Sequence, residues 1–348
     1  MDLGLSADQR ALVASVSSLL GTNSTTARVR QAEERGFDPD LWRRLTEFGA
    51  VAMGVPEAAG GGGATLVDLA LVAEQAGRYL ASAPLVEAVV AARLLARCGT
   101  ARYALLDHAL ASTEPLVIAL HRAVQSTFRL VPGGAVAGLV VGLDGADLIA
   151  VTDQAPGRAR ANIGSAALAD RSAAPAAGSR TVLLAGPTAA VAYEGALAEW
   201  KALTAAALVG LAQGALDLAV EYAKTRHQFG VPIGSFQALS HRLADCATAL
   251  EGARLLTREA AWSFGAEPDG SGEFGSPALA SMAFVFAAET AQQITAASLH
   301  VHGGMGFAME TDVQLFFRRA QAWPQVYSGI RAEYQRLADL EFGPEGVR

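Results

Sequence analysis

Cysteine is nearly absent from this chain. Only Cys98 and Cys246 occur in 348 residues, and neither has a His or Cys neighbour at the spacing of metal ligands. Two isolated thiols exclude a disulfide framework and a cysteine-based zinc site. Because free thiols persist in a reducing compartment, we expect a cytoplasmic protein that binds no metal.

Positive charge and long apolar runs are also scarce. The chain has 27 Lys and Arg against 34 Asp and Glu, which gives a formal charge of −7. An acidic protein repels nucleic acid at long range, and no Lys/Arg run is long enough to follow a phosphate backbone. The first ten residues include charged side chains instead of an apolar leader, and no later uncharged apolar run reaches about 18 residues. We therefore expect a soluble protein that binds neither nucleic acid nor a membrane.

Aromatic residues make up 7% of the chain and charged residues 18%, whereas hydrophobic residues, with many Ala among them, reach 51%. This composition favours closely packed helices over an all-β barrel. The length exceeds that of one ordinary domain, so two or three structural units are expected.

Helical patterns fill the first third of the chain. Ser6 precedes apolar residues at helical spacing through Leu20, and a second helix follows Pro39 and stops at Gly49. Two further helices are expected over residues 65–80 and 84–97. These patterns predict an N-terminal α-helical domain over residues 1–108.

Short β-prone runs replace the helices over residues 109–192. The runs are separated by Gly, Pro and Asp and lie at residues 116–120, 137–141, 148–151 and 181–184. A looser stretch rich in Ala, Gly and Ser occupies residues 155–180. The pattern predicts a reduced middle β domain.

Helical periodicity returns for the remainder of the chain. The expected helices cover residues 197–227, 235–264, 278–302 and 310–321, and a polar loop joins two of them at residues 266–276. A C-terminal four-helix-bundle domain is therefore expected over residues 193–348.

Two motifs in this helical part indicate a dinucleotide, and specifically a flavin. Residues 226–230 read RHQFG and are followed by Gln237, whereas residues 300–307 read HVHGGMGF. A guanidinium can fork onto a pyrophosphate, and an amide can orient beside it. Paired glycines let backbone N–H groups approach a ligand closely.

These motifs, together with others at fixed places, resemble the acyl-CoA dehydrogenase superfamily over nearly the whole chain. The matching pieces are Leu41-Trp42 with Leu45 and Gly49, VPE at 55–57, Gly77-Arg78, the stretch 210–230 with Gln237, and HGGMGF with Glu310 and Arg318. The resemblance implies a mainly α fold with a small β domain, arranged as an N-terminal helical domain, a middle β domain and a C-terminal four-helix bundle.

The resemblance also implies an FAD shared across a dimer, because in that family the adenosine-pyrophosphate half is held by the neighbouring subunit. The positions that match this group are Arg226, Gln228, Phe229, Gln237, Gly303 and Gly304. His300 stands where the family usually has Gln, and its ring can still donate to a phosphate or ribose oxygen. His302 is interpreted as a packing or helix-end residue. Arg226 could alternatively be a cation that stabilises a helix end.

The other half of the family's flavin site is missing from the middle domain. The family has a Thr-Glu-Pro segment followed by a small-residue loop, and later a Trp-Ser/Thr element. Here Thr113-Glu114-Pro115 runs directly into a β-prone stretch, and the domain contains no Trp. We interpret the Thr-Glu-Pro match as chance.

The family's catalytic base is also missing, although α,β-desaturation needs a carboxylate to remove the α-proton. The usual position holds Tyr327 or Ser328, and a second position used by a minority of members holds Trp200. Glu199 is adjacent, but one helical step turns a side chain by about 100°. We therefore predict no catalytic residue in this chain, with Glu199 as the weak alternative.

The hypothesis that follows is a subunit of a heteromeric (α2β2) acyl-CoA dehydrogenase, similar to the partner chains of enzymes that desaturate CoA thioesters of steroid side chains. A homologous catalytic subunit would carry the Glu, an acyl-CoA would be the substrate, and an electron-transfer flavoprotein would accept the electrons. One alternative is a self-sufficient homo-oligomer with Glu199 as base. The other is a non-enzymatic helical scaffold that has lost flavin.

Overall fold

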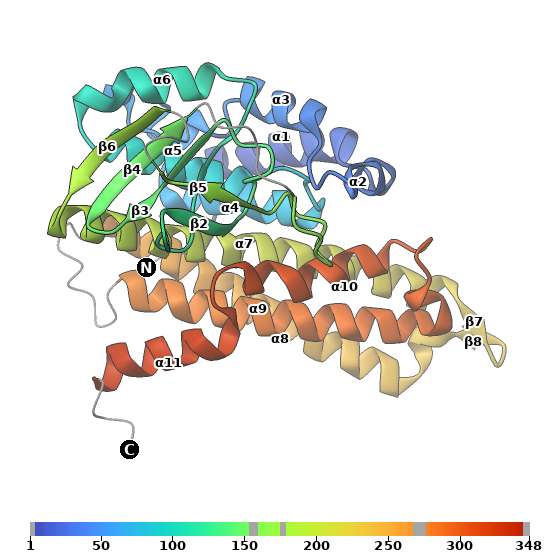
Figure 1. Cartoon of the computed structure of the whole chain (residues 1–348). Helices are drawn as coiled ribbons and strands as arrows, with labels where there is room; N and C mark the ends of the chain where they lie inside the picture. Colours follow the sequence, from blue (N-terminus) through green and yellow to red (C-terminus); the bar gives the residue numbers. More distant parts are fainter. Residues whose placement is uncertain (1–3, 153–158, 175–178, 267–275, 344–348) are drawn as a thin grey trace. The chain divides into compact units, whose positions relative to one another are not determined.

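The computed structural model describes residues 4–152, 159–174, 179–266 and 276–343 (Figure 1). The chain forms two compact units, each made of separate segments. Unit 1 consists of residues 1–26, 70–81 and 202–348, and unit 2 consists of residues 27–69 and 82–201. The division into domains 1–108, 109–192 and 193–348 stays a prediction, and the expected loop at 266–276 lies largely outside the described residues.

Unit 1 is helical apart from one short hairpin. Its elements are α1 (Ala7–Asn23), the end of α4 (Leu66–Arg78), α7 (Pro187–Thr225) from residue 202, β7 (His227–Gln228), β8 (Val231–Pro232), η4 (Ile233–Ser235), α8 (Gln237–Ala266), α9 (Ser276–His302), η5 (Gly303–Phe307), α10 (Val313–Ala322), η6 (Trp323–Val326) and α11 (Gly329–Phe342). Helices α8 and α9 pack against each other, and α9 also contacts α10 and α11.

Helix α1 begins as the sequence predicts. The Ser6 hydroxyl accepts from the backbone N–H of Gln9, and the Gln9 side chain accepts from the backbone N–H of Ser6, which is a capping box. Further along, Ser17 Oγ lies 2.8 Å from Tyr79 Oη, and Ser24 Oγ donates to the Tyr79 carbonyl at 2.9 Å. These two contacts hold α1 against the end of α4.

Helices α4 and α7 cross in unit 1 with their backbones in contact. A Cβ atom placed on Gly77 would lie 1.8 Å from the carbonyl oxygen of Ala207, and one placed on Gly210 would lie 1.7 Å from that of Glu74. No side chain fits at such distances, so glycine is required at both positions. This explains physically why glycines occupy two of the motif positions found in the sequence.

Unit 2 contains the remaining helices and the larger sheet. Its helical elements are α2 (Thr26–Ala32), α3 (Pro39–Glu47), η1 (Ala52–Gly54), η2 (Glu57–Ala59), α5 (Leu85–Arg97), η3 (Thr100–Arg102), α6 (Tyr103–Ala111) and the first part of α7. Its strands are β1 (Leu116–Ile118), β2 (Thr127–Val131), β3 (Leu139–Asp144), β4 (Asp147–Thr152), β5 (Ala169–Ser172) and β6 (Ser179–Ala185).

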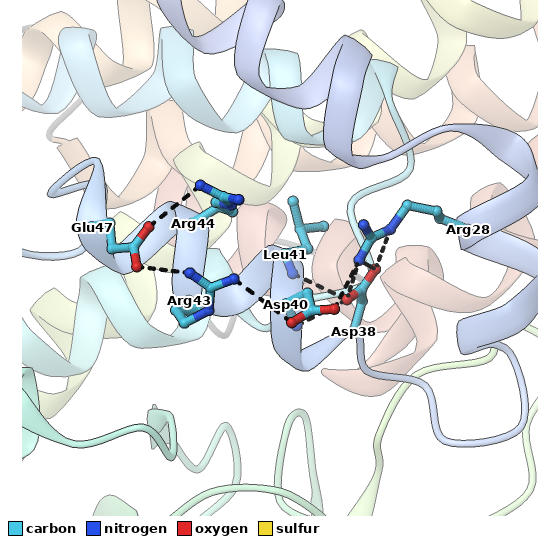
Figure 2. A network of polar contacts seen from close by, with 7 residues as sticks. All are labelled: Arg28, Asp38, Asp40, Leu41, Arg43, Arg44 and Glu47. Carbon is cyan, nitrogen blue, oxygen red and sulfur yellow. Dashed lines mark hydrogen bonds and ion pairs between the residues drawn. The ribbon is translucent and has the colours of Figure 1, made fainter.

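A polar network fixes the start of α3 (Figure 2). Asp38 Oδ1 accepts from the backbone N–H groups of Asp40 and Leu41, each at 3.0 Å, and so caps the helix. The Arg28 guanidinium of α2 forks onto the same carboxylate at 2.9 to 3.1 Å. One side chain thus caps α3 and joins it to α2.

The four predicted β runs correspond to the strands of a four-stranded sheet in the order β1-β3-β4-β6. Strand β1 is parallel to β3, and the other pairs are antiparallel. Strands β2 and β5, which the sequence did not predict, form a separate antiparallel pair. Strand β5 reads ADRS, and its Arg171 is buried with Nη1 donating to the carbonyls of Gly134 and Ala137. A buried arginine on a polar strand hides the alternation by which strands are recognised.

Helix α7 begins at Pro187, ten residues earlier than predicted, because Pro at the first helical position follows Gly186 with its positive φ of 66°. Helix α11 was also not predicted. By length and composition α7 is apolar enough to span a membrane, with a mean hydropathy of 1.6, but 78% of that apolar window is buried inside the protein. It is therefore a core helix.

The α4–α7 crossing predicts a sharp difference between two glycines of α7. Gly210→Ala should lower the free energy of unfolding by about 3 kcal/mol, because the added methyl group displaces a backbone carbonyl. Gly195→Ala, where a Cβ meets nothing within 4 Å, should be neutral or stabilise by up to about 1 kcal/mol. Urea unfolding followed by circular dichroism measures both changes. Equal unfolding midpoints for Gly210→Ala and Gly195→Ala would contradict the close backbone contact between α4 and α7.

Candidate functional site

The first sequence motif forms the tip of a hairpin at the end of α7. The backbone N–H of Arg226 donates to the Tyr222 carbonyl at 2.9 Å, and that of Ile233 donates to the Arg226 carbonyl at 2.8 Å. Between strands β7 and β8, Phe229 and Gly230 both have positive φ, 55° and 83°. Two consecutive positive φ values are the signature of a type I′ hairpin turn.

Phe229 is strained and almost fully exposed. An L-residue in the left-handed region costs about 1–2 kcal/mol, and this turn position favours Asn, Asp or Gly. The ring is nonetheless 92% exposed, and its contact with Phe236 is edge-on at 6.1 Å. An aromatic ring held out at such a cost indicates a contact outside the chain.

Four polar side chains of the two motifs are without partners of their own. Arg226, Gln228, Gln237 and His300 are all exposed. Within the part of the chain that the structure describes, none of these four side chains makes a hydrogen bond or an ion pair. They are therefore open to a ligand that offers both acceptors and donors.

The second motif lies at the same end of unit 1. The His302 ring at the end of α9 stacks on the Tyr222 ring near the end of α7, with centroids 4.4 Å apart. Gly303 follows with a φ of 62°, and a Cβ on Gly303 or Gly304 would meet nothing within 4 Å. The backbone here is open to close approach. The structure thus brings the hairpin motif and the paired glycines together.

Glu199, the alternative base, is locked in an ion pair. Its carboxylate is 2% exposed and accepts from Arg93 Nε at 2.9 Å and from Arg97 Nη1 at 2.6 Å. Burial alone would raise the pKa of Glu199, but the charges of Arg97 and Arg93 outweigh it and hold the pKa below its usual value. A base needs a carboxylate free to take a proton, so this geometry favours a structural role.

Trp200, at the other candidate position, is buried and donates from Nε1 to Glu87 Oε1 at 3.0 Å. Burial raises the pKa of the Glu87 carboxyl, and the hydrogen bond from the Trp200 indole opposes this shift. Sequence reasoning missed Glu87. The sequence feature that could have revealed Glu87 is a single carboxylate among apolar residues at the start of α5.

The third candidate position also lacks a carboxylate. Tyr327 is buried, with the Arg336 guanidinium 5.4 Å from its ring centroid, and Ser328 directly precedes α11. Among the described residues no group of His, Cys, Asp and Glu side chains could hold a metal ion.

Known proteins place this architecture in a family. The family models "Acyl-CoA dehydrogenase, N-terminal domain" and "Acyl-CoA dehydrogenase, C-terminal domain" match residues 6–103 and 190–331. Acyl-CoA dehydrogenase IpdE2 of Mycolicibacterium smegmatis is 32% identical over 340 residues, which is 96% of this chain and 98% of that protein. The chain belongs to the acyl-CoA dehydrogenase family, whose members are oxidoreductases that act on acyl-CoA.

Solved structures agree with this assignment. The ChsE4–ChsE5 complex from Mycobacterium tuberculosis matches with a TM-score of 0.83 and 26% identity, over 97% of this chain and 98% of that one. The Tcur3481–Tcur3483 steroid ACAD matches with a TM-score of 0.81 and 26% identity, over 96% and 97%. A glutaryl-CoA dehydrogenase from Mycobacterium smegmatis in complex with FADH2 is 14% identical with a TM-score of 0.82 and shows the fold alone. The mainly α fold with a small β domain is confirmed.

The family generally binds FAD. The exposed residues at the end of unit 1 fit its adenosine-pyrophosphate half by their chemistry. Arg226 supplies a cation without a counter-charge among the described residues, the two glutamines supply amides, and Gly303 and Gly304 leave backbone accessible. A pyrophosphate needs charge-assisted donors of this kind.

The ion pair of Glu199 predicts a stability effect with a defined pH dependence. Glu199→Gln should lower the free energy of unfolding by about 2 kcal/mol at pH 7, less than for a fully buried pair because Arg97 is half-exposed. Since the folded pKa is lowered, this stabilisation is fully present above the ordinary Glu pKa of about 4.3 and is lost as pH falls below it. Urea unfolding of the wild type and of Glu199→Gln at pH 7 and at about pH 3 measures the difference in their free energies of unfolding, which should be smaller at the lower pH.

Glu194→Gln on the same helix is the matched control. Its ion pair with Arg122 is solvent-exposed, so its effect should stay below about 1 kcal/mol. If Glu199→Gln unfolded like the wild type but abolished flavin reduction by acyl-CoA in the assembled enzyme, Glu199 would be a base and the structural interpretation would be wrong.

Proposed function

We propose that this chain is the non-catalytic subunit of a heteromeric, FAD-dependent acyl-CoA dehydrogenase. It holds the adenosine-pyrophosphate half of an FAD whose isoalloxazine lies on a homologous partner subunit, and that partner carries the catalytic Glu. The observation that carries the proposal is that the Phe229 ring and the polar side chains of Arg226, Gln228, Gln237 and His300 are exposed, and that these four polar side chains have no partner among the described residues. It is supported by the absence of a free carboxylate at Glu199, Trp200, Tyr327 and Ser328.

In this proposal the residues of the chain bind and orient the cofactor. Arg226 would bind the pyrophosphate, and Gln228, Gln237 and His300 would donate to oxygens beside it. Phe229 would contact an apolar part of the ligand, and the backbone at Gly303 and Gly304 would leave room for it. The bound flavin would supply the hydride acceptor for the β-carbon of the acyl group, and a carboxylate of the partner would supply the base for the α-proton.

Relatives support a partner of the same family. The matched complexes ChsE4–ChsE5 and Tcur3481–Tcur3483 each pair two chains, and this chain aligns with them over almost its full length. An α2β2 assembly with one FAD per heterodimer is therefore proposed. The word steroid in the name of the second complex supports a CoA thioester of a steroid side chain as substrate. An electron-transfer flavoprotein is proposed as electron acceptor, and the cytoplasm as location.

Substitution of Arg226 tests the proposal. The sample is the native complex, purified from the source organism by means of an affinity tag on this chain. Arg226→Met should weaken FAD binding by about 10- to 100-fold, because it removes charge-assisted hydrogen bonds worth about 1.5–3 kcal/mol. The FAD affinity of Arg226→Lys should lie between those of the wild type and Arg226→Met, since an ammonium keeps the charge but cannot make the two parallel hydrogen bonds of a guanidinium. The dissociation constant is measured from flavin fluorescence after dialysis.

Lys224→Met is the control, because it removes an exposed cation one step before the end of the same helix. Its FAD affinity should equal that of the wild type. Unchanged flavin content and activity in Arg226→Met would contradict the proposal and favour the scaffold alternative.

A further inference from the structure

The imidazole of His302 is oriented by two contacts within unit 1. Its Nδ1 lies 2.7 Å from the carbonyl oxygen of Ser298, one turn earlier in α9. Its ring stacks on Tyr222 with an interplanar angle of 25°. The stacking fixes the plane of the ring, and the hydrogen bond fixes its rotation in that plane. Sequence reasoning anticipated packing at His302 but not this orientation.

The hydrogen bond also fixes which nitrogen carries the proton. A carbonyl oxygen only accepts, so Nδ1 is the donor, and in the neutral ring Nε2 is left with a lone pair. Nε2 lies on the edge of the ring that faces away from the Ser298 carbonyl. Within the described residues it has no hydrogen-bond partner. In its neutral form, His302 therefore presents a pre-oriented acceptor.

This acceptor lies between the two segments of the candidate site. On one side, Tyr222 is one turn before Arg226, and the two residues share a backbone hydrogen bond. On the other side, Gly303 and Gly304 follow His302 directly in the chain. The His302 ring is thus joined to one segment through Tyr222 and to the other through the chain.

The acceptor character of Nε2 selects the part of the ligand that it can contact. Phosphate oxygens are acceptors, so a neutral Nε2 gains nothing from them. The adenosine half of FAD offers hydroxyl donors on its ribose. We propose that His302 accepts a hydrogen bond at Nε2 from a hydroxyl of this ribose, and that Tyr222 positions the ring for it. This inference rests on the proposed function and deepens it, because Arg226 would bind the pyrophosphate and His302 the sugar.

Analogues of FAD that lack single donors test the assignment. The flavin-free complex is titrated with FAD, with analogues that lack the 2′- or the 3′-hydroxyl of the adenosine ribose, and with one that lacks the adenine amino group. The wild type should bind one of the deoxyribose analogues about five- to tenfold more weakly than FAD. In His302→Phe this preference for FAD over the deoxyribose analogue should vanish, because phenylalanine keeps the stacking on Tyr222 but has no hydrogen-bond acceptor.

Two further variants keep the test decisive. His302→Asn retains a donor, Nδ2, for the Ser298 carbonyl, but its acceptor Oδ1 stands at the place of the ring Cδ2 and does not reach the position of Nε2. It should therefore behave like His302→Phe even if the phenylalanine variant folds poorly. His108→Phe, on α6 of unit 2, should keep the wild-type preference. A structural role for His302 would weaken FAD and the analogues equally and leave their ratio unchanged, which would overturn the inference.

Arg226→Met separates this inference from the proposed function. If it weakens FAD binding while His302→Phe keeps the full preference for the ribose hydroxyl, the proposed function stands and the His302 assignment is wrong. If neither variant changes the affinity for FAD or for any analogue, the proposed function and the His302 assignment are both wrong. Loss of discrimination against the analogue without the amino group, and not against the deoxyribose analogues, would also overturn the ribose assignment.

Discussion

The backbone contact between α4 and α7 is the constraint on which the rest of unit 1 depends. Glycines at positions 77 and 210 let a backbone carbonyl of each helix pack against the glycine of the other, and this contact fixes the position of α7 along its axis. The hydroxyl of Ser298 then donates to the carbonyl of Ala215 at 2.9 Å and joins α9 to the same helix. The fixed helices end together, so the hairpin after α7 and the glycines after α9 meet at one place.

Two charged residues of the chain, Glu199 and Arg226, lie in opposite situations. Glu199 is a buried carboxylate that two guanidinium groups already neutralise, whereas Arg226 is an exposed guanidinium without a counter-charge among the described residues. Because the Glu199 carboxylate is held in this ion pair, it is not free to act as a base. Arg226 is a cation ready for an anionic ligand. This pair of features supports the proposal that the chain completes a cofactor site on another subunit.

Local patterns predicted much of the fold and supplied the residues of the candidate site, whose role stays a prediction. The cap at Ser6, most of the longer helices and the four strands of the larger sheet follow from neighbours in sequence. The partners of Glu199 could not be predicted, because Arg93 and Arg97 are about a hundred residues away and no local rule connects them. The stacking of His302 on Tyr222 likewise joins distant segments. Strand β5 was missed because the fold buries an arginine where a strand pattern expects an apolar residue.

The ratio of flavin to protein chains is the most direct test of the account. The complex purified from its own cells should contain one FAD for each pair of this chain and its homologous partner, and the chain expressed alone should be colourless. The opposite result would be a yellow preparation of this chain alone, with one FAD per chain and dehydrogenation of an acyl-CoA. That result would show a complete active site in a homo-oligomer and would contradict the division of the cofactor between two kinds of subunit.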